Sequence, residues 1–201
     1  AAKKNKIQIA LVLGGGNIYR GRELTSLNID QVSADYIGML STIMNGIALS
    51  NFLSSNNCEN SLFSSFAIGN FVKAYSKEEA EKSLIEDKIV ILVGGLGNPL
   101  FTTDSTASVR AVELNSDVML KATNVDGVYS DDPKVNKEAI KYEHLSFDEA
   151  ITKNLKVMDQ TSLCFCRDNN LSVRVFNADA EGAILEAIIN ENTDIGTLVE
   201  L

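Results

Sequence analysis

Short apolar runs alternate along this chain with longer segments in which apolar residues recur every three or four positions. The clearest run, Ile89–Val93, contains no polar residue, which is typical of a strand buried on both faces of a parallel sheet. Further strands are expected at Ile7–Leu13, Leu62–Ile68, Val118–Ala122, Ser172–Phe176 and Gly196–Leu201. The longest helical spacing covers Val32–Phe52, and shorter helices are expected within 76–84, 104–112, 146–153, 159–169 and 182–190. This alternation predicts an α/β fold with three α/β/α layers around a mostly parallel central sheet, in a single domain over residues 1–201.

Polar residues stand where several of these helices are expected to begin. Ser76 and Ser146 are each followed three residues later by Glu, the pattern of a capping box, and Asp159 precedes a third helical segment. Asp35 falls in the predicted first turn of the longest helix, where the helix dipole favours a carboxylate; the functional alternative is that it accepts hydrogen bonds from ligand hydroxyls. The Ser- and Asn-rich stretch Asn51–Ser65 is expected to be a surface loop.

Composition narrows the class of protein. A length of 201 residues fits one domain, and the formal net charge of −9 argues against a nucleic-acid partner, whose phosphate backbone requires an excess of Lys and Arg. The cysteines Cys58, Cys164 and Cys166 show no metal-ligand spacing, which favours idle thiols in a reducing cytoplasm. His144 is the single histidine, so a catalytic triad or a multi-His metal centre is disfavoured. No apolar run approaches membrane-span length, so we expect no membrane partner.

Two glycine-rich segments follow predicted strands. Gly94, Gly95 and Gly97 come directly after Ile89–Val93, and Thr102-Thr103-Asp104 is typical of the start of the next helix. Glycines let backbone N–H groups approach an anion, and a helix N-terminus favours negative charge. These features predict a phosphate-binding loop; the alternative is an ordinary turn between a strand and a helix.

The other glycine-rich segment is Gly14–Asn17, with Arg20 and Arg22 just beyond it. Arg offers a planar fork for phosphate oxygens, and two solvated surface cations are the equal alternative. Tyr19 stands where a dinucleotide fingerprint requires Gly, and Gly21 is not followed by the Lys and Ser/Thr of a P-loop. A Rossmann oxidoreductase is therefore disfavoured. In an α/β sheet both glycine segments would lie at carboxyl ends of strands, where ligands bind.

A polar segment, Thr123–Pro133, follows the strand expected at Val118–Ala122. Asp126-Gly127 is a turn signal that predicts a tight hairpin. The carboxylates here suit sugar hydroxyls or the water of a hydrated Mg²⁺, and Tyr129 suits contact with a base. The alternative is a solvated loop.

Six segments extend in order over most of the chain: Gly14–Gly21, Asp35–Asn45, Gly97–Asp104, Lys121–Tyr129, Lys156–Asp159 and Arg174–Asn177. Together they resemble the amino-acid kinase fold family and, within it, the bacterial uridylate (UMP) kinases. The third segment marks the fold family broadly, whereas the second and fifth point to the UMP kinase branch.

The resemblance implies transfer of the ATP γ-phosphate to UMP, giving UDP and ADP in pyrimidine nucleotide biosynthesis. The implied catalytic residues are Arg20 and Asp104, with Asp104 orienting cationic groups rather than acting as a base. The residues implied in UMP binding are Gly15, Asp35, Leu96, Gly97, Asn98, Pro99, Leu100, Phe101, Thr102 and Thr103. The residues implied in ATP binding are Gly16, Arg20, Thr123, Tyr129 and Asp132.

The resemblance also implies Mg²⁺ with ATP as the phosphoryl donor, a cytoplasmic homohexamer, activation by GTP and inhibition by UTP. It leaves the metal ligands and the effector site unassigned. The acceptor phosphate is already ionised near neutral pH, so catalysis rests on in-line positioning and on offsetting charge.

The chain also departs from this family. The family opens with a strand carrying Lys-x-Ser-Gly, whose Lys contacts the phosphates, and no such motif occurs here; the region Asn57–Phe66 also fits poorly. We therefore expect that the sequence omits segments of a longer protein, which an intact mass would test. A chain of this length alone is expected to bind UMP but to phosphorylate it poorly. Two alternatives stay open: a kinase of the same fold acting on a carboxylate such as glutamate or aspartate, and a non-catalytic nucleotide-binding protein.

Overall fold

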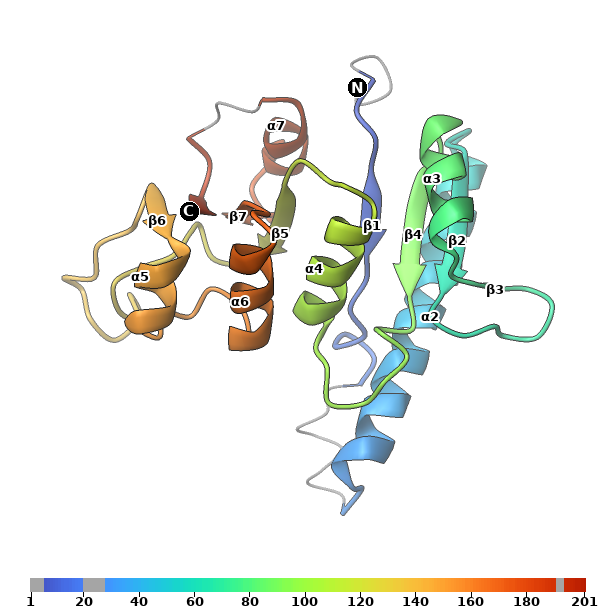
Figure 1. Cartoon of the computed structure of the whole chain (residues 1–201), viewed down its shortest axis with the longest axis horizontal. Coiled ribbons are helices and arrows are strands. Elements are labelled where there is room, and N and C mark those ends of the chain that lie inside the picture. Colours follow the sequence, from blue (N-terminus) through green and yellow to red (C-terminus); the bar gives the residue numbers. More distant parts are fainter. Residues whose placement is uncertain (1–5, 20–27, 191–193) are drawn as a thin grey trace. The chain divides into compact units, whose positions relative to one another are not determined.

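The computed structural model describes residues 6–19, 28–190 and 194–201 (Figure 1). These residues divide into two compact units, each described by itself: the first unit is Gln8–Thr106, and the second is formed chiefly by Ala107–Leu201. The first unit contains β1 (Ala10–Val12), α2 (Gln31–Ser55), β2 (Asn60–Ser64), β3 (Lys73–Ala74), α3 (Lys77–Ile85) and β4 (Ile89–Val93). Helix α4 (Thr103–Glu113) begins in the first unit and ends in the second. The second unit contains β5 (Met119–Thr123), β6 (His144–Ser146), α5 (Phe147–Thr152), α6 (Gln160–Asp168), β7 (Val173–Asn177), α7 (Ala183–Ile189) and β8 (Thr197–Glu200).

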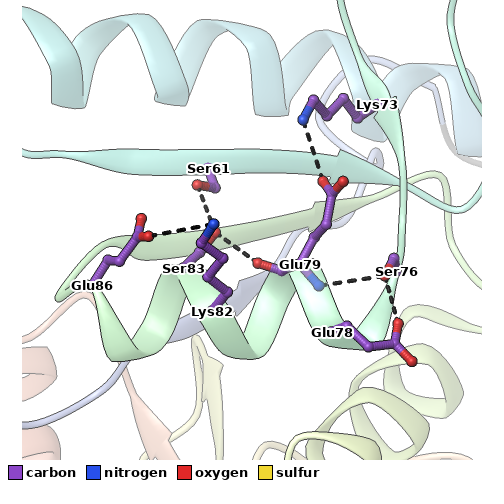
Figure 2. Close-up of polar contacts among 8 residues, drawn as sticks. All are labelled: Ser61, Lys73, Ser76, Glu78, Glu79, Lys82, Ser83 and Glu86. Atoms are coloured by element: carbon purple, nitrogen blue, oxygen red, sulfur yellow. Dashed lines mark hydrogen bonds and ion pairs between the residues drawn. The ribbon is translucent and has the colours of Figure 1, made fainter.

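The first unit is built on a four-stranded sheet in the order β1-β4-β2-β3, and its strands pair in parallel. Strand β4 lies between β1 and β2, and Val90, Ile91 and Leu92 are at most 2% exposed. Helices α2 and α3 cover opposite faces of β2 and β4 (Figure 2). The prediction of a β4 strand buried on both faces is therefore confirmed.

Helix α2 carries apolar residues on two faces, one buried and one exposed. Met39 and Ile43 are buried, and Ile43 packs with Ile91 and Val93 of β4. Ile47 packs partly buried against the same cluster, whereas Tyr36 and Leu40 are exposed. The length and composition of α2 would also suit a membrane span, but its buried face belongs to a helix that covers a sheet.

The boundaries of α2 correct two expectations. Asp30 is its N-cap and accepts the Ser33 N–H at 3.0 Å, and hydrogen bonds from Ser33 lower the pKa of Asp30. Asp35 therefore lies beyond the first turn, and the dipole argument for it was wrong. The prediction of a surface loop over 51–65 was also wrong, because the helix runs to Ser55 and β2 begins at Asn60. The Asn60 amide donates to the Ser50 carbonyl at 3.2 Å, so these polar residues close the helix end onto the strand.

The predicted helix caps are confirmed. Ser76 accepts the Glu79 N–H at 3.3 Å at the start of α3, while the Glu79 carboxylate pairs with Lys73 instead of returning to the cap (Figure 2). Ser146 accepts the Glu149 N–H at 3.1 Å before α5. Asp159 caps α6 by accepting the Ser162 N–H at 2.9 Å.

The second unit holds a sheet in the order β5-β7-β8-β6, in which β8 is antiparallel to β7 and parallel to β6. Val173 and Val175 face a core formed with α5 and α6, while Phe176 packs against Ala183 and Ala187 of α7 on the other face. Helices therefore cover both faces of this sheet. The α/β class with mostly parallel strands is confirmed, and the described strands are hydrogen-bonded as two four-stranded sheets.

The hairpin expected at Asp126-Gly127 does not form. Residues 124–127 make a bend, and the antiparallel bridge nearby joins Tyr129 to Lys141. His144 lies on β6 and is exposed, with its Nδ1 3.1 Å from a Glu200 carboxylate oxygen.

Gly46 sets how closely α2 approaches the sheet. A Cβ at Gly46 would lie 2.6 Å from Cγ1 of Val93, so we expect Gly46→Ala to destabilise the fold by about 1–3 kcal/mol through overpacking. Gly38→Ala on the same helix is the matched control, because no atom lies within 4 Å of its Cβ position. Relief of glycine's backbone entropy should stabilise this control by roughly 0.5–1 kcal/mol. Denaturant unfolding of both variants measures the difference, and similar effects of the two would contradict the close approach.

Candidate functional site

Three polar residues of α2, Asp35, Thr42 and Asn45, are spaced by seven and three positions and so lie near one face of the helix. Each contacts a glycine-rich turn that follows a strand. Since β1 and β4 are parallel neighbours, with Val12 opposite Leu92, both turns leave the sheet at the same edge. Carboxyl ends of parallel strands are where α/β proteins bind ligands, so this edge is the candidate site.

The turn after β1 is held against α2 at close range. A Cβ at Gly15 would lie 2.6 Å from the Gly38 carbonyl oxygen and 2.7 Å from Cβ of Ser41, so only glycine fits there. Asn45 Nδ2 donates to the Gly14 carbonyl at 2.8 Å and to Asn17 Oδ1 at 2.7 Å. The Asn45 side chain thereby fixes the backbone at Gly14 and the side chain of Asn17.

The turn after β4 is held at three points. Thr42 Oγ1 accepts the Gly94 N–H at 2.7 Å, and Ser65 Oγ donates to the Gly95 carbonyl. Asp35 Oδ2 accepts the Leu100 N–H at 2.7 Å. Gly94 has a φ of +76° and Leu100 a φ of +72°, a region that L side chains rarely adopt. The turn is therefore shaped by its partners on α2 and directly after β2 as well as by its glycines.

The turn ends in the first residues of α4. Thr102 Oγ1 accepts the Ser105 N–H at 3.1 Å and so caps the helix. A Cβ at Gly14 would lie 3.7 Å from Thr103 Oγ1, so the start of α4 lies beside the turn after β1. The N-terminus of a helix and the N–H groups of glycine turns both favour an anion.

The structure thus brings together most of the residues predicted to bind UMP. Gly15 and Asp35 lie with residues 96–103 at one edge of the first unit, and Gly16 and Asp104 adjoin them in the sequence. Arg20, predicted to be catalytic, and Arg22 lie outside the described residues.

Thr123, Tyr129 and Asp132, predicted to hold the nucleoside part of ATP, belong to the second unit. Thr123 ends β5 and its Oγ1 accepts the Val125 N–H at 2.9 Å. Tyr129 OH donates to Asp126 at 2.9 Å, and this bond raises the pKa of the Tyr129 phenol. Asp132 Oδ1 accepts the Lys134 N–H at 2.9 Å, which fixes the turn that follows.

No cluster of three or more His, Cys, Asp or Glu side chains suited to a metal ion occurs in the described part of the chain. Mg²⁺ in phosphoryl-transfer sites keeps several waters and takes one or two carboxylates together with substrate phosphates. A donor set as small as Asp104 alone is compatible with a magnesium ion that arrives with ATP.

Sequence reasoning missed Thr42, Asn45 and Ser65 as parts of this site. The signal for the first two was present: both are polar, on a mostly apolar helix, at helical spacing from Asp35. Their partners are backbone groups of distant turns, which no local pattern specifies. Ser65 carried no comparable signal, because it lies directly after β2 in a stretch that looked like a loop.

The first unit thus has a ligand edge built from glycine turns and a helix N-terminus, an arrangement that suits a phosphate-containing ligand. The family model of the Amino acid kinase family matches residues 1–177. The chain therefore belongs to the amino acid kinase family.

Within this family the chain is similar to uridylate kinases. It is 45% identical over 194 residues to the uridylate kinase of Alcanivorax borkumensis, covering 96% of this chain and 76% of that protein. It is 46% identical to the uridylate kinase of Coxiella burnetii, covering 96% and 79%. The crystal structure of UMP kinase from Bacillus anthracis matches with a TM-score of 0.93 at 39% identity, covering 98% of this chain and 81% of that chain. The uridylate kinase structure from Archaeoglobus fulgidus matches with a TM-score of 0.71 at 26% identity, covering 97% and 86%.

The bond between Tyr129 and Asp126 predicts how the phenol titrates. Because the folded chain raises the pKa of Tyr129, its contribution to stability is present below the ordinary tyrosine pKa and is lost as the pH rises through the raised value. Asp126→Asn should lower the pKa of Tyr129 towards the ordinary value. Tyrosine absorbance during alkaline titration measures this, with Tyr129→Phe identifying its signal among the five tyrosines. Asp131→Asn is the control; an equal change there would assign the shift to general charge rather than to this bond.

Proposed function

We propose that this chain catalyses the Mg²⁺-dependent transfer of the ATP γ-phosphate to UMP. The observation that carries the proposal is the meeting of Asp35, the turn after β4 and the start of α4 at one edge of the first unit. A nucleoside monophosphate offers the complementary groups, because its ribose hydroxyls suit a carboxylate and its phosphate suits a helix N-terminus. The similarity to uridylate kinases over 96% of the chain supports the same substrate.

In the proposed acceptor complex, Asp35 accepts hydrogen bonds from the ribose hydroxyls and Asn98 bonds the edge of the uracil. Asn98 is exposed within the turn after β4. Thr103 bonds the acceptor phosphate from the first turn of α4, where the helix dipole adds favourable potential. Gly15 is part of the same site, since its backbone follows β1 without a side chain in the way.

On the donor side, Gly16 and Arg20 contact the transferring phosphates, while Thr123, Tyr129 and Asp132 hold the nucleoside part of ATP. The acceptor oxygen is already ionised, so no strong base is needed and Asp104 orients cationic groups instead. Mg²⁺ bound to ATP offsets the charge of the phosphate oxygens. The residues of this chain act chiefly by aligning the acceptor oxygen with the phosphorus atom and by supplying N–H donors and Arg for the charge.

Two further functions remain as outcomes of the test. A kinase of this fold acting on a glutamate- or aspartate-type carboxylate would show turnover or stabilisation with the amino acid. A non-catalytic nucleotide-binding protein would bind UMP without turnover. A ligand at 100 times its dissociation constant adds about 2.7 kcal/mol to stability, so thermal shifts with UMP, CMP and glutamate separate these cases.

Asp35→Asn is the sharpest test of the acceptor site. Weakening a charge-assisted hydrogen bond to the ribose is expected to raise the KM for UMP by about ten-fold or more in a coupled assay of ADP formation. Asp30→Asn is the matched control on the same helix, because Asn is an equally good N-cap and the Asp30 carboxylate caps the helix through Ser33. An unchanged KM for UMP in the Asp35→Asn variant would show that Asp35 does not contribute to UMP binding. Turnover with glutamate instead of UMP would replace the substrate.

We also propose that the protein is a cytoplasmic homohexamer responsive to GTP and UTP. The exposed stripe of α2, namely Val32, Tyr36, Leu40 and Met44, supports self-association: these apolar side chains recur every four residues and are 43–58% exposed. Ridges of this spacing pack well against a second helix of the same kind. The three thiols are free, which suits a reducing compartment.

Light scattering after size exclusion measures the assembly. The expected mass is six times that of the 21.8 kDa chain. Met44→Glu places a charge in the exposed stripe of α2 and should reduce the mass, because a buried unpaired charge is costly. Ile85→Glu on α3 is the control, since Ile85 is 76% exposed and outside the stripe, and it should leave the mass unchanged. Effector response is read by adding GTP or UTP to the coupled assay. A monomeric parent chain would overturn the hexamer.

A further inference from the structure

Thr42 occupies an unusual position in the middle of α2. Its side chain is buried, at 5% exposed, yet its hydroxyl is fully engaged. Oγ1 donates to the Met39 carbonyl at 2.7 Å and accepts the Gly94 N–H at 2.7 Å. The second bond joins the helix to the residue directly after β4, across 52 positions of sequence.

The hydrogen bond of the Gly94 N–H is important for the turn after β4, because Gly94 is where the chain leaves the sheet. Gly94 is buried, and a buried N–H without a partner is strongly disfavoured. Its φ of +76° sets the direction of the turn, and the Gly97 N–H returns to its carbonyl at 3.1 Å. Whatever fixes Gly94 therefore fixes the start of the segment that ends at Leu100 and Thr103.

Packing alone does not explain a hydroxyl here. The close contact between α2 and the strands is made by Ile43 and by Gly46 against Val93. A valine at position 42 would have nearly the same shape but would leave the Gly94 N–H without its acceptor. The hydroxyl thus serves the geometry of the turn rather than the volume of the core.

We propose that Thr42 is a positioning residue for the acceptor site: it orients residues 94–103 for UMP through the Gly94 N–H without touching the ligand. This inference rests on the proposed function. It predicts that loss of the hydroxyl weakens UMP binding more than ATP binding, because the displaced groups are those of the turn after β4.

The test compares Thr42→Val with Thr42→Ser, which keeps the hydroxyl. Thr42→Val should raise the KM for UMP by about ten-fold, since small displacements of binding groups are costly, while the KM for ATP stays within about two-fold. Thr42→Ser should remain close to the parent chain. A general loss of stability would not produce this split between the two substrates or the rescue by serine.

Thr197→Val is the matched control. Thr197 is buried like Thr42, accepts the Val128 N–H at 2.8 Å and donates to the Tyr142 carbonyl, but it lies in the second unit. It should leave the KM for UMP unchanged although it removes the same kind of buried bond. An equal rise in the KM for UMP for both variants would assign the effect to stability and overturn the proposal.

Amide hydrogen exchange tests the role of Thr42 without nucleotide and therefore independently of the proposed function. Thr42→Val should speed exchange over residues 94–100 relative to the parent and to Thr197→Val, with no nucleotide added. If the parent chain binds no UMP but this loosening occurs, the positioning role stands and the acceptor assignment fails. Unchanged exchange over 94–100 would overturn the role of Thr42. So would a Thr42→Val chain that binds UMP as tightly as a parent chain shown to bind it.

Discussion

The candidate site depends on the contact between one helix and two turns. Helix α2 approaches the sheet so closely that Gly15 and Gly46 leave no room for a Cβ. At that distance the short side chains of Thr42 and Asn45 reach the backbone of the turns after β4 and β1. A larger separation would break these bonds, since N–H···O hydrogen bonds need donor–acceptor distances of about 2.7–3.2 Å. The close packing of α2 on the sheet and the hydrogen bonds from α2 to the two turns therefore depend on each other.

This arrangement accounts for the proposed anion site in an acidic chain. The net charge is −9, yet the turns and the start of α4 supply backbone N–H groups whose partial charges do not depend on side-chain composition. The glycines are needed for approach, and the polar residues of α2 hold the donors in place before a ligand arrives. Preorganised donors are more effective than mobile ones because no reorganisation accompanies binding.

Local signals were sufficient for much of this fold and insufficient for the rest. Strand β4 was predictable because an unbroken apolar run has few alternatives, and the Ser76, Ser146 and Asp159 caps were predictable because capping is a contact over three residues. The extent of α2 was not, because Asn and Ser have weak intrinsic preferences that tertiary contacts override. Thr42 illustrates the same limit within the site, since the bond that defines it spans the sequence from α2 to the end of β4.

Asp35 and Thr42 have different roles in the proposed acceptor site, and substitutions of the two residues therefore test different things. The Asp35 carboxylate already accepts the Leu100 N–H and the Gln31 amide, each at 2.7 Å. A carboxylate has about four acceptor positions, so ribose hydroxyls can join these bonds without displacing them. Replacing Asp35 therefore alters both the ligand contact and the turn that carries the other ligand contacts. Replacing Thr42 alters the turn alone, because its hydroxyl is buried and its partners are Met39 and Gly94. The difference between the two effects is the part of UMP recognition that belongs to the Asp35 carboxylate itself.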